Sequence, residues 1–243
     1  MYEPRTYRGW VSDRDLFSFS VVVRETDLLI RATRNLKGRA RAATQRCRAA
    51  LEKYIQTHPG FVTSLEPIPV DEDAPHIVME MARAARQAGV GPMAAVAGAV
   101  AEAVGRELLL FADEVIVENG GDIFMKSLKE RLVGVYAGES SLSGGITFAI
   151  QPWDTPLGIC TSSGSVGHSL SLGRADAVVV TSESTALADA AATAIANMVK
   201  SKEDIPAALE FAQGIERLAG VAIIKDDSMG LRGQLKIAGA TGK

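Results

Sequence analysis

Cysteine is nearly absent from this sequence, which excludes two common ways of stabilising a protein. Only Cys47 and Cys160 occur, far apart and without CxxC spacing. A disulfide framework or a structural zinc site needs several such residues at characteristic spacings. Because neither is indicated, we expect a cytoplasmic protein.

Aromatic residues are also scarce, at 5% of the chain, and the formal net charge is only −3. Binding to nucleic acid would need basic residues interleaved with stacking aromatics, so we expect no nucleic-acid partner. The Ala- and Gly-rich run without charged or amide side chains, Ala88 to Ala101, is shorter than the roughly 20 residues that cross a membrane. The opening stretch, MYEPRTYRGW, lacks the basic and then apolar pattern of an export signal. We therefore expect no membrane partner.

Apolar residues, by contrast, are plentiful and make up 47% of the 243 residues. A chain of this length and composition can bury a full core. We expect a single domain over residues 1–243, built from two intimately packed α+β halves.

Local patterns predict a mixed order of strands and helices. In chain order we expect strands at 17–23 and 28–33, helices at 37–56 and 76–88, an Ala-rich helix opened by Pro92, short strands at 115–117, 123–125, 132–136 and 146–150, a strand at 178–181, helices at 186–200 and 205–213, a closing pair of strands at 221–225 and 231–237, and a frayed tail from 238. Strands do not alternate regularly with helices, and no GxGxxG follows the first strand, so a Rossmann domain is disfavoured. The order predicts an α+β fold with helices packed on one side of antiparallel sheet.

Two oxygen-bearing side chains lie four residues apart near the start of the helix predicted at 186–200. Asp189 and Thr193 therefore share one helix face, with Cβ atoms about 5–6 Å apart. Both oxygens can then reach one hard cation, and oxygen ligands suit magnesium better than zinc. The alternative is an ordinary polar pair on a surface helix.

Two glycine-containing segments accompany this pair. Asn119-Gly120-Gly121-Asp122 lies between two short predicted strands, where the glycines permit positive φ and close approach of a ligand to the backbone. The segment Thr161-Ser162-Ser163-Gly164 offers hydroxyls and small residues whose amides can surround a phosphate. An ordinary tight hairpin and a plain flexible loop are the respective alternatives.

Taken together, these segments resemble the ApbE-like superfamily, and the resemblance runs from about Gly91 to Ile237. The stretch Ala188 to Ala194, ADAAATA, is similar to the ADALATA segment of that family, and Asn119 to Ile123 is similar to its NxGGDI turn. Thr161 to Gly164 resembles its TSG element. His168 falls at the histidine of its HIIDP motif, and Val96 to Ala99 corresponds to its AKGYA segment.

This resemblance implies a T-fold-like architecture and a magnesium-dependent pocket for FAD. It assigns Asp189, Thr193 and the backbone carbonyl of Val96 to the metal. It assigns His168 to catalysis, as a group that moves a proton or as a hydrogen-bonding scaffold residue. The flavin or another nucleotide falls to Asn119, Gly120, Gly121, Asp122, Thr161, Ser162, Ser163 and Gly164.

The best-known members of the superfamily transfer FMN from FAD to a protein, so one hypothesis is FMN transfer to a protein acceptor, or cleavage of the FAD pyrophosphate. The chain departs from the family pattern at Ala97, where the motif has lysine, and at residues 169–172, SLSL in place of IIDP. The chain therefore resembles an uncharacterised cytoplasmic branch more than a secreted flavinylating enzyme. The alternative hypothesis is a non-catalytic flavin or nucleotide-binding protein that serves sulfur or redox metabolism.

Two further expectations accompany these hypotheses. Cys160 lies beside the Gly/Ser-rich segment and is either a reactive thiolate stabilised by backbone amides or a buried, inert residue. Exposed edges of small antiparallel sheets are commonly covered by a partner, so we expect a homo-oligomer.

Overall fold

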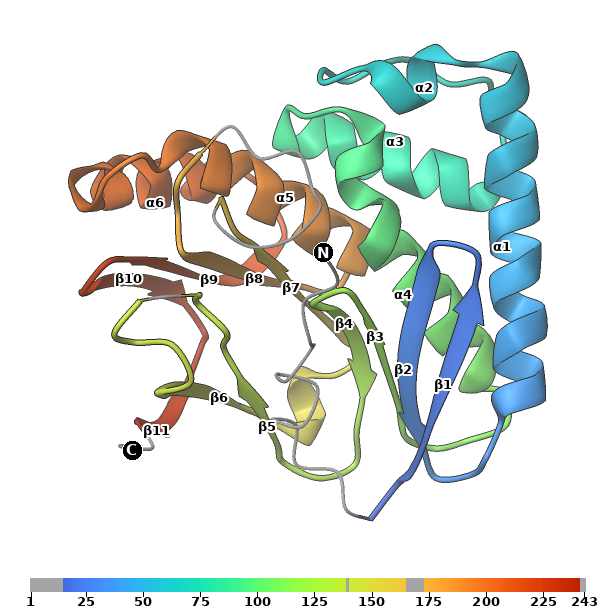
Figure 1. Cartoon of the computed structure of the whole chain (residues 1–243), viewed down its shortest axis with the longest axis horizontal. Coiled ribbons are helices and arrows are strands. Elements are labelled where there is room, and N and C mark those ends of the chain that lie inside the picture. Colours follow the sequence, from blue (N-terminus) through green and yellow to red (C-terminus); the bar gives the residue numbers. More distant parts are fainter. Residues whose placement is uncertain (1–14, 139, 165–172, 241–243) are drawn as a thin grey trace.

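The protein is built of three layers, with helices on one face of a large sheet and a small sheet on the other (Figure 1). The computed structural model describes residues 15–138, 140–164 and 173–240. The large sheet has eight strands in the order β1-β2-β3-β4-β7-β8-β9-β10, and the small sheet has three in the order β11-β6-β5. All neighbouring strands are antiparallel. This arrangement confirms the predicted α+β class and the predicted placement of the helices.

The large sheet consists of two similar units placed side by side. Each unit has two strands, a group of helices and two more strands, and the units meet where β4 pairs with β7. The strands of the first unit are β1 (Phe17–Val23), β2 (Thr26–Ala32), β3 (Val115–Asn119) and β4 (Asp122–Lys126). Those of the second are β7 (Leu157–Ser162), β8 (Ala177–Ser182), β9 (Leu218–Lys225) and β10 (Ser228–Gly233). The small sheet contains β5 (Arg131–Gly134), β6 (Ile146–Ile150) and β11 (Ile237–Ala240).

The α-helices lie above and to the right of the large sheet in Figure 1, with α1 at the right-hand side. They are α1 (Lys37–Thr57), α2 (Gly60–Thr63), α3 (His76–Ala88), α4 (Val96–Leu108), α5 (Thr185–Met198) and α6 (Ile205–Gln213), with 3-10 turns η2 (Pro92–Ala95), η3 (Pro152–Asp154) and η4 (Lys202–Asp204). The hydroxyl of Ser184 caps α5 by accepting a hydrogen bond of 3.3 Å from the amide of Leu187. Helix α5 is almost wholly buried, and its many alanines allow close contact with α3, α4 and the strands beneath.

Two separate hydrophobic cores fill the spaces between the layers. Val115, Val117 and Phe124 belong to the core under the helices, whereas Ile116 and Met125 belong to the core between the two sheets. This division follows from the alternation of side chains along a strand. Because both faces of the central strands are covered, runs such as Ala177 to Val180 are apolar without alternation.

Several sequence predictions are corrected at the sheets. Thr161 and Ser162, which we expected in a loop, are the last residues of β7, a strand the sequence analysis missed. The four strands predicted between 115 and 150 are present but divide between the two sheets, a division that the sequence did not predict. The strand predicted at 231–237 is two strands in different sheets, and residues 238–240 belong to β11 and are not frayed.

None of the individual helices in the described ranges is long and apolar enough to cross a membrane. The pair α3 and η2–α4 passes a test of length and composition together, but it bends by 106° at its break.

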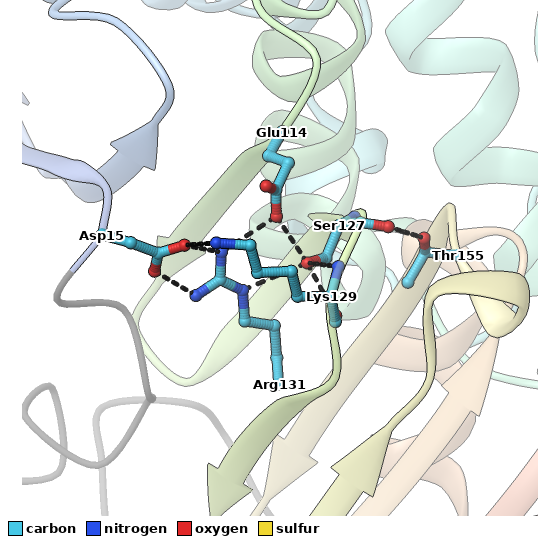
Figure 2. Close-up of polar contacts among 6 residues, drawn as sticks. All are labelled: Asp15, Glu114, Ser127, Lys129, Arg131 and Thr155. Atoms are coloured by element: carbon cyan, nitrogen blue, oxygen red, sulfur yellow. Dashed lines mark hydrogen bonds and ion pairs between the residues drawn. The ribbon is translucent and has the colours of Figure 1, made fainter.

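A partly buried network of polar side chains connects the residues before β1 to the small sheet (Figure 2). Arg131, at the start of β5, is 3% exposed and donates hydrogen bonds of 2.6 Å to Asp15 and 2.9 Å to Glu114. The Ser127 hydroxyl donates to Glu114 at 2.7 Å and accepts from Arg131 Nε at 3.1 Å. Burial opposes ionisation of Glu114, but hydrogen bonds from Ser127 and Arg131 outweigh it and lower the pKa of this carboxyl.

We expect Arg131→Met to lower the free energy of unfolding by about 3–5 kcal/mol, because it leaves the buried Glu114 carboxylate without its ion-pair partner. Urea denaturation measures this change. The matched control is Lys129→Met, which removes an ion pair to Asp15 from a side chain that is 65% exposed and should cost less than about 1 kcal/mol. Equal losses in the two variants would contradict this account of the network.

Candidate functional site

Helices α4 and α5 cross closely at their first turns and exchange hydrogen bonds there. Helix α4 has no side-chain cap of its own, and the Asp189 carboxylate of α5 accepts a hydrogen bond of 2.8 Å from the Gly98 amide. In return, the Glu102 carboxylate of α4 accepts one of 2.7 Å from the Thr185 amide of α5. Each carboxylate satisfies a donor that its partner helix cannot satisfy and lies at the positive end of that helix.

The crossing requires glycine at position 98. A Cβ there would lie 2.4 Å from the Thr185 carbonyl oxygen and 2.9 Å from Asp189 Cβ. Gly98 therefore serves a close approach of two helices, whereas Gly105, further along α4, lies against the Phe124 ring of β4.

The β3–β4 hairpin brings a third segment to the same place. Asn119 and Asp122 are paired across the hairpin, and the two glycines between them have φ of 68° and 109°, as the sequence predicted. The Asn119 amide group donates a hydrogen bond of 3.1 Å to the Ala97 carbonyl oxygen. The hairpin tip is thus attached to the first turn of α4, beside the residue that binds Asp189.

Asp122 is buried on the helix-facing side of β4, the side that also carries Phe124. Burial raises the pKa of Asp122 to about 7. Hydrogen bonds from Cys160 and from the Thr161 backbone oppose this shift, and the nearby Glu118 charge adds to it. Within the described part of the chain, Asp122 Oδ1 has no hydrogen-bond partner.

Asp189 is half-buried, and its pKa is raised well above the usual range. Burial is the main cause and repulsion from Asp122 is the second, while the amides of Gly98 and Ala97 act in the opposite direction. The two carboxyl groups are therefore close enough to influence each other, although one lies on a strand and the other on a helix.

Cys160 lies on β7 beside this pair and is fully buried. Its thiol donates a weak hydrogen bond of 3.4 Å to the Thr185 carbonyl oxygen. Burial, followed by the charges of Asp122 and Asp189, raises the pKa of the thiol. These surroundings support the inert reading of Cys160 and disfavour a reactive thiolate.

Only part of the Thr161–Gly164 segment faces the region of Asp122, Cys160 and Asp189. Ser162 follows Cys160 by two residues and shares its helix-facing side, whereas Thr161 shares the opposite side with Ile159. The Ser163 hydroxyl and the Gly164 amide both donate to the Ala175 carbonyl oxygen, at 3.5 and 2.9 Å. As contacts of a ligand, these four residues stay a prediction.

The three residues predicted as metal ligands, Val96, Asp189 and Thr193, lie on α4 and α5 near the point where the two helices cross. Val96 is the first residue of α4, and Thr193 lies one turn after Asp189 on α5; both are half-buried. No group of three His, Cys, Asp or Glu side chains suited to a metal ion occurs among the described residues. His168 lies outside the described residues. The roles of Val96, Asp189, Thr193 and His168 stay predictions.

Sequence analysis did not identify Glu102 or the contact between Asp122 and Cys160. The sequence signal that could have indicated Glu102 is its spacing. Glu102 lies four residues after Gly98, and Asp189 lies four residues after Thr185, so each helix has a carboxylate four residues after the amide that the other helix binds. A polar cleft of about 170 Å³ adjoins this side of the crossing. It is lined by Glu80, Arg83, Ala84, Gln87, Glu102, Arg106, Glu183, Ser184 and Arg217, none of which is a predicted site residue.

The fold belongs to a class seen in solved flavin transferases. The flavin transferase ApbE from Vibrio cholerae matches with a TM-score of 0.60 and 15% identity, over 89% of this chain and 96% of that one. The apo form of the Pseudomonas stutzeri flavinyl transferase ApbE matches with a TM-score of 0.60 and 13% identity, over 89% and 94%. At such identities, the likeness is one of fold.

The family model described as "AbpE bacteria" matches residues 8–229, and the chain belongs to this family. The match extends well before Gly91, where the resemblance seen in the sequence began. The chain is 40% identical to a UPF0280 protein of Methanocaldococcus jannaschii and 42% identical to one of Methanopyrus kandleri. Each alignment covers 90% of this chain and 91% of the relative.

We expect Gly98→Ala to lower the free energy of unfolding by about 1–3 kcal/mol, because the added Cβ forces the two helices apart. Urea denaturation checks this. Gly38→Ala is the matched control, since a Cβ at this position in α1 meets nothing within 4 Å; it should stabilise the protein by about 0.4–1 kcal/mol. A Gly98→Ala variant as stable as wild type would show that the helices can separate freely.

We expect the metal-free protein to lose stability as pH rises from about 4 to about 7, because Asp122 has a higher pKa folded than unfolded. The slope due to this group is at most about 1.4 kcal/mol per pH unit. Asp122→Asn should remove that part of the slope and gain on wild type as pH rises, while the exposed control Asp113→Asn should follow wild type. Urea denaturation at several pH values with a chelator measures this; parallel curves for wild type and Asp122→Asn would be inconsistent with a raised pKa.

Proposed function

We propose that this chain is a magnesium-dependent FAD-binding protein that cleaves the FAD pyrophosphate and transfers FMN to an acceptor. Its family and its fold support this proposal. The observation that carries it is the meeting of three distant segments at one place. Asp189 bonds to Gly98, and Asn119 bonds to Ala97, so α5, the first turn of α4 and the glycine hairpin share one polar centre.

The residues at this centre fit a magnesium ion. The Asp189 carboxylate, the Thr193 hydroxyl and the Val96 carbonyl are all hard oxygen donors. A carboxylate has about four acceptor sites, so the hydrogen bond from Gly98 leaves Asp189 able to bind a cation. Magnesium usually takes one or two carboxylates together with waters and substrate phosphates, which agrees with a site that lacks three grouped acidic side chains.

Each neighbouring residue has a defined task in this proposal. The Gly120 and Gly121 backbone, which carries no side chains, admits a flavin nucleotide close to the hairpin, and Asn119 holds the hairpin against α4. Asp122, Ser162, Ser163 and Gly164 line the nucleotide together with the backbone of Thr161. His168 moves the proton of the attacking hydroxyl. When bound, magnesium neutralises charge that develops on the phosphates during transfer.

The reaction breaks the phosphorus–oxygen bond between the two phosphates of FAD. The FMN phosphate joins the oxygen of an acceptor hydroxyl, whose proton is removed, and AMP leaves. With water in place of a protein acceptor, the products are FMN and AMP.

The second candidate is a flavin or nucleotide-binding protein without transferase activity, serving sulfur or redox metabolism. Two departures from the transferase pattern favour it, namely Ala97 in place of lysine and SLSL at 169–172 in place of IIDP. Both changes remove groups that can carry charge.

We also propose that the chain acts as a single cytoplasmic domain of two halves and forms homo-oligomers. Strand β1 is an edge of the large sheet, and its sequence FSFSVVV has no charge and no proline to block pairing. Phe17 and Val22 on this strand are more than half exposed.

We expect wild-type protein to bind FAD and to release AMP from it when magnesium is added, with or without candidate acceptor proteins. Asp189→Asn should lower the rate of AMP release at least about 100-fold, since an asparagine oxygen can still accept from Gly98 but binds a cation weakly. Chromatography of the nucleotides and mass spectrometry of the proteins measure both products, and Asp113→Asn serves as the control. Bound but intact FAD would favour the second candidate, and absence of FAD binding would overturn both.

A further inference from the structure

The buried carboxyl group of Asp122 lacks a structural explanation. Asp122 is 7% exposed, and its Oδ1 has no hydrogen-bond partner in the described part of the chain. Burial of a carboxyl oxygen without a partner is costly, and each such atom in a native structure needs an explanation. The resemblance to flavin transferases places Asp122 in the turn near the flavin and gives it no role toward the metal.

The segments that carry Asp122 and Asp189 are attached to two consecutive residues of α4. Asn119, the residue opposite Asp122 in the hairpin, bonds to the Ala97 carbonyl oxygen. Asp189 bonds to the Gly98 amide. The strand that carries one carboxyl and the helix that carries the other are thus fixed to the same turn, and the two groups interact electrostatically.

Acidic side chains gather at this point. The charge that acts most strongly on Asp122 is that of Glu118, and the charge that acts most strongly on Asp189 is that of Asp122. When both are ionised, the buried Asp122 carboxylate and the half-buried Asp189 carboxylate repel each other, and a divalent cation between them removes that repulsion.

We propose that Asp122 supplies a second carboxylate, through Oδ1, to the divalent-cation site built on Asp189. This inference rests on the metal site of the proposed function and adds a ligand from β4 to those from α4 and α5. The Thr161 amide then acts as a positioning group, because its hydrogen bond to Asp122 fixes the direction of the carboxylate. The site has one carboxylate from strand β4 of the first unit and one from helix α5 of the second.

The first test is titration of the metal-free full-length protein with Mn²⁺ or Mg²⁺ by calorimetry, without flavin. We expect Asp122→Asn to weaken metal binding at least about tenfold and Asp189→Asn to abolish it, while Asp113→Asn binds as wild type. Tight binding by Asp122→Asn would overturn this inference and leave the proposed function standing. Absence of binding by wild type would overturn the metal site itself and this inference with it.

The second test needs no variant and therefore does not depend on whether Asp122→Asn folds. Crystals of the wild-type protein soaked in Mn²⁺ are read by anomalous scattering at the manganese edge. We expect one ion at bonding distance, about 2.0–2.3 Å, from an oxygen of each carboxylate. An ion on Asp189 and Thr193 with Asp122 turned away overturns the second ligand alone, and a map without manganese overturns the site.

Discussion

The close crossing of α4 and α5 is the constraint on which the rest of the site depends. The helices approach until the Gly98 backbone contacts the Thr185 carbonyl and the Asp189 side chain, and each then provides the carboxylate that caps the other. Helix ends buried without such partners leave several amides unsatisfied. The hydrogen bonds that Asp189 and Glu102 accept from the opposite helix therefore make a buried crossing possible. The bond from Gly98 also sets the direction in which Asp189 points.

The crossing also explains why polar residues lie where a core would be expected. Asp122 and Cys160 are on the helix-facing side of the central strands, among apolar neighbours such as Val117 and Phe124. Glycine at 158 lets Thr185 lie directly on β7, since a Cβ at this position would be 2.4 Å from Thr185 Cα. Gly98 and Gly158 thus allow the start of α5 to lie close to the sheet, next to the polar side chains of Asp122 and Cys160.

Much of the fold could be predicted because local signals agree with it. Helix α3 lies between Pro75 and a left-handed Gly89, and the bounds of β1, β6, α3 and α6 match the prediction. Strand β7 was missed because its signal is weakened by the residues that its tertiary contacts require. Gly158 accommodates Thr185, and the hydroxyls at 161 and 162 lower its apolar content. Residues 231–237 read as one strand, but the chain changes sheets after Gly233, where φ is 82°.

In the candidate site too, local patterns could be predicted from the sequence and contacts between distant segments could not. Spacing along one helix was enough to pair Asp189 with Thr193, whereas no local pattern links Asp122 to Asp189, because they meet only through the register of β3 with β4 and the contacts of α4.

The position of Asp189 at the start of α4 has one further consequence for any bound cation. The amides of a helix N-terminus carry a partial positive charge, which stabilises the carboxylate but repels a metal ion on its far side. One carboxylate between a positive helix end and a divalent cation balances only part of their combined charge. A second carboxylate on the other side of the cation, from a rigid strand rather than from either helix, corrects this imbalance without disturbing the cap. Asp122 lies on such a strand, and its unpartnered oxygen is the group that the arrangement requires.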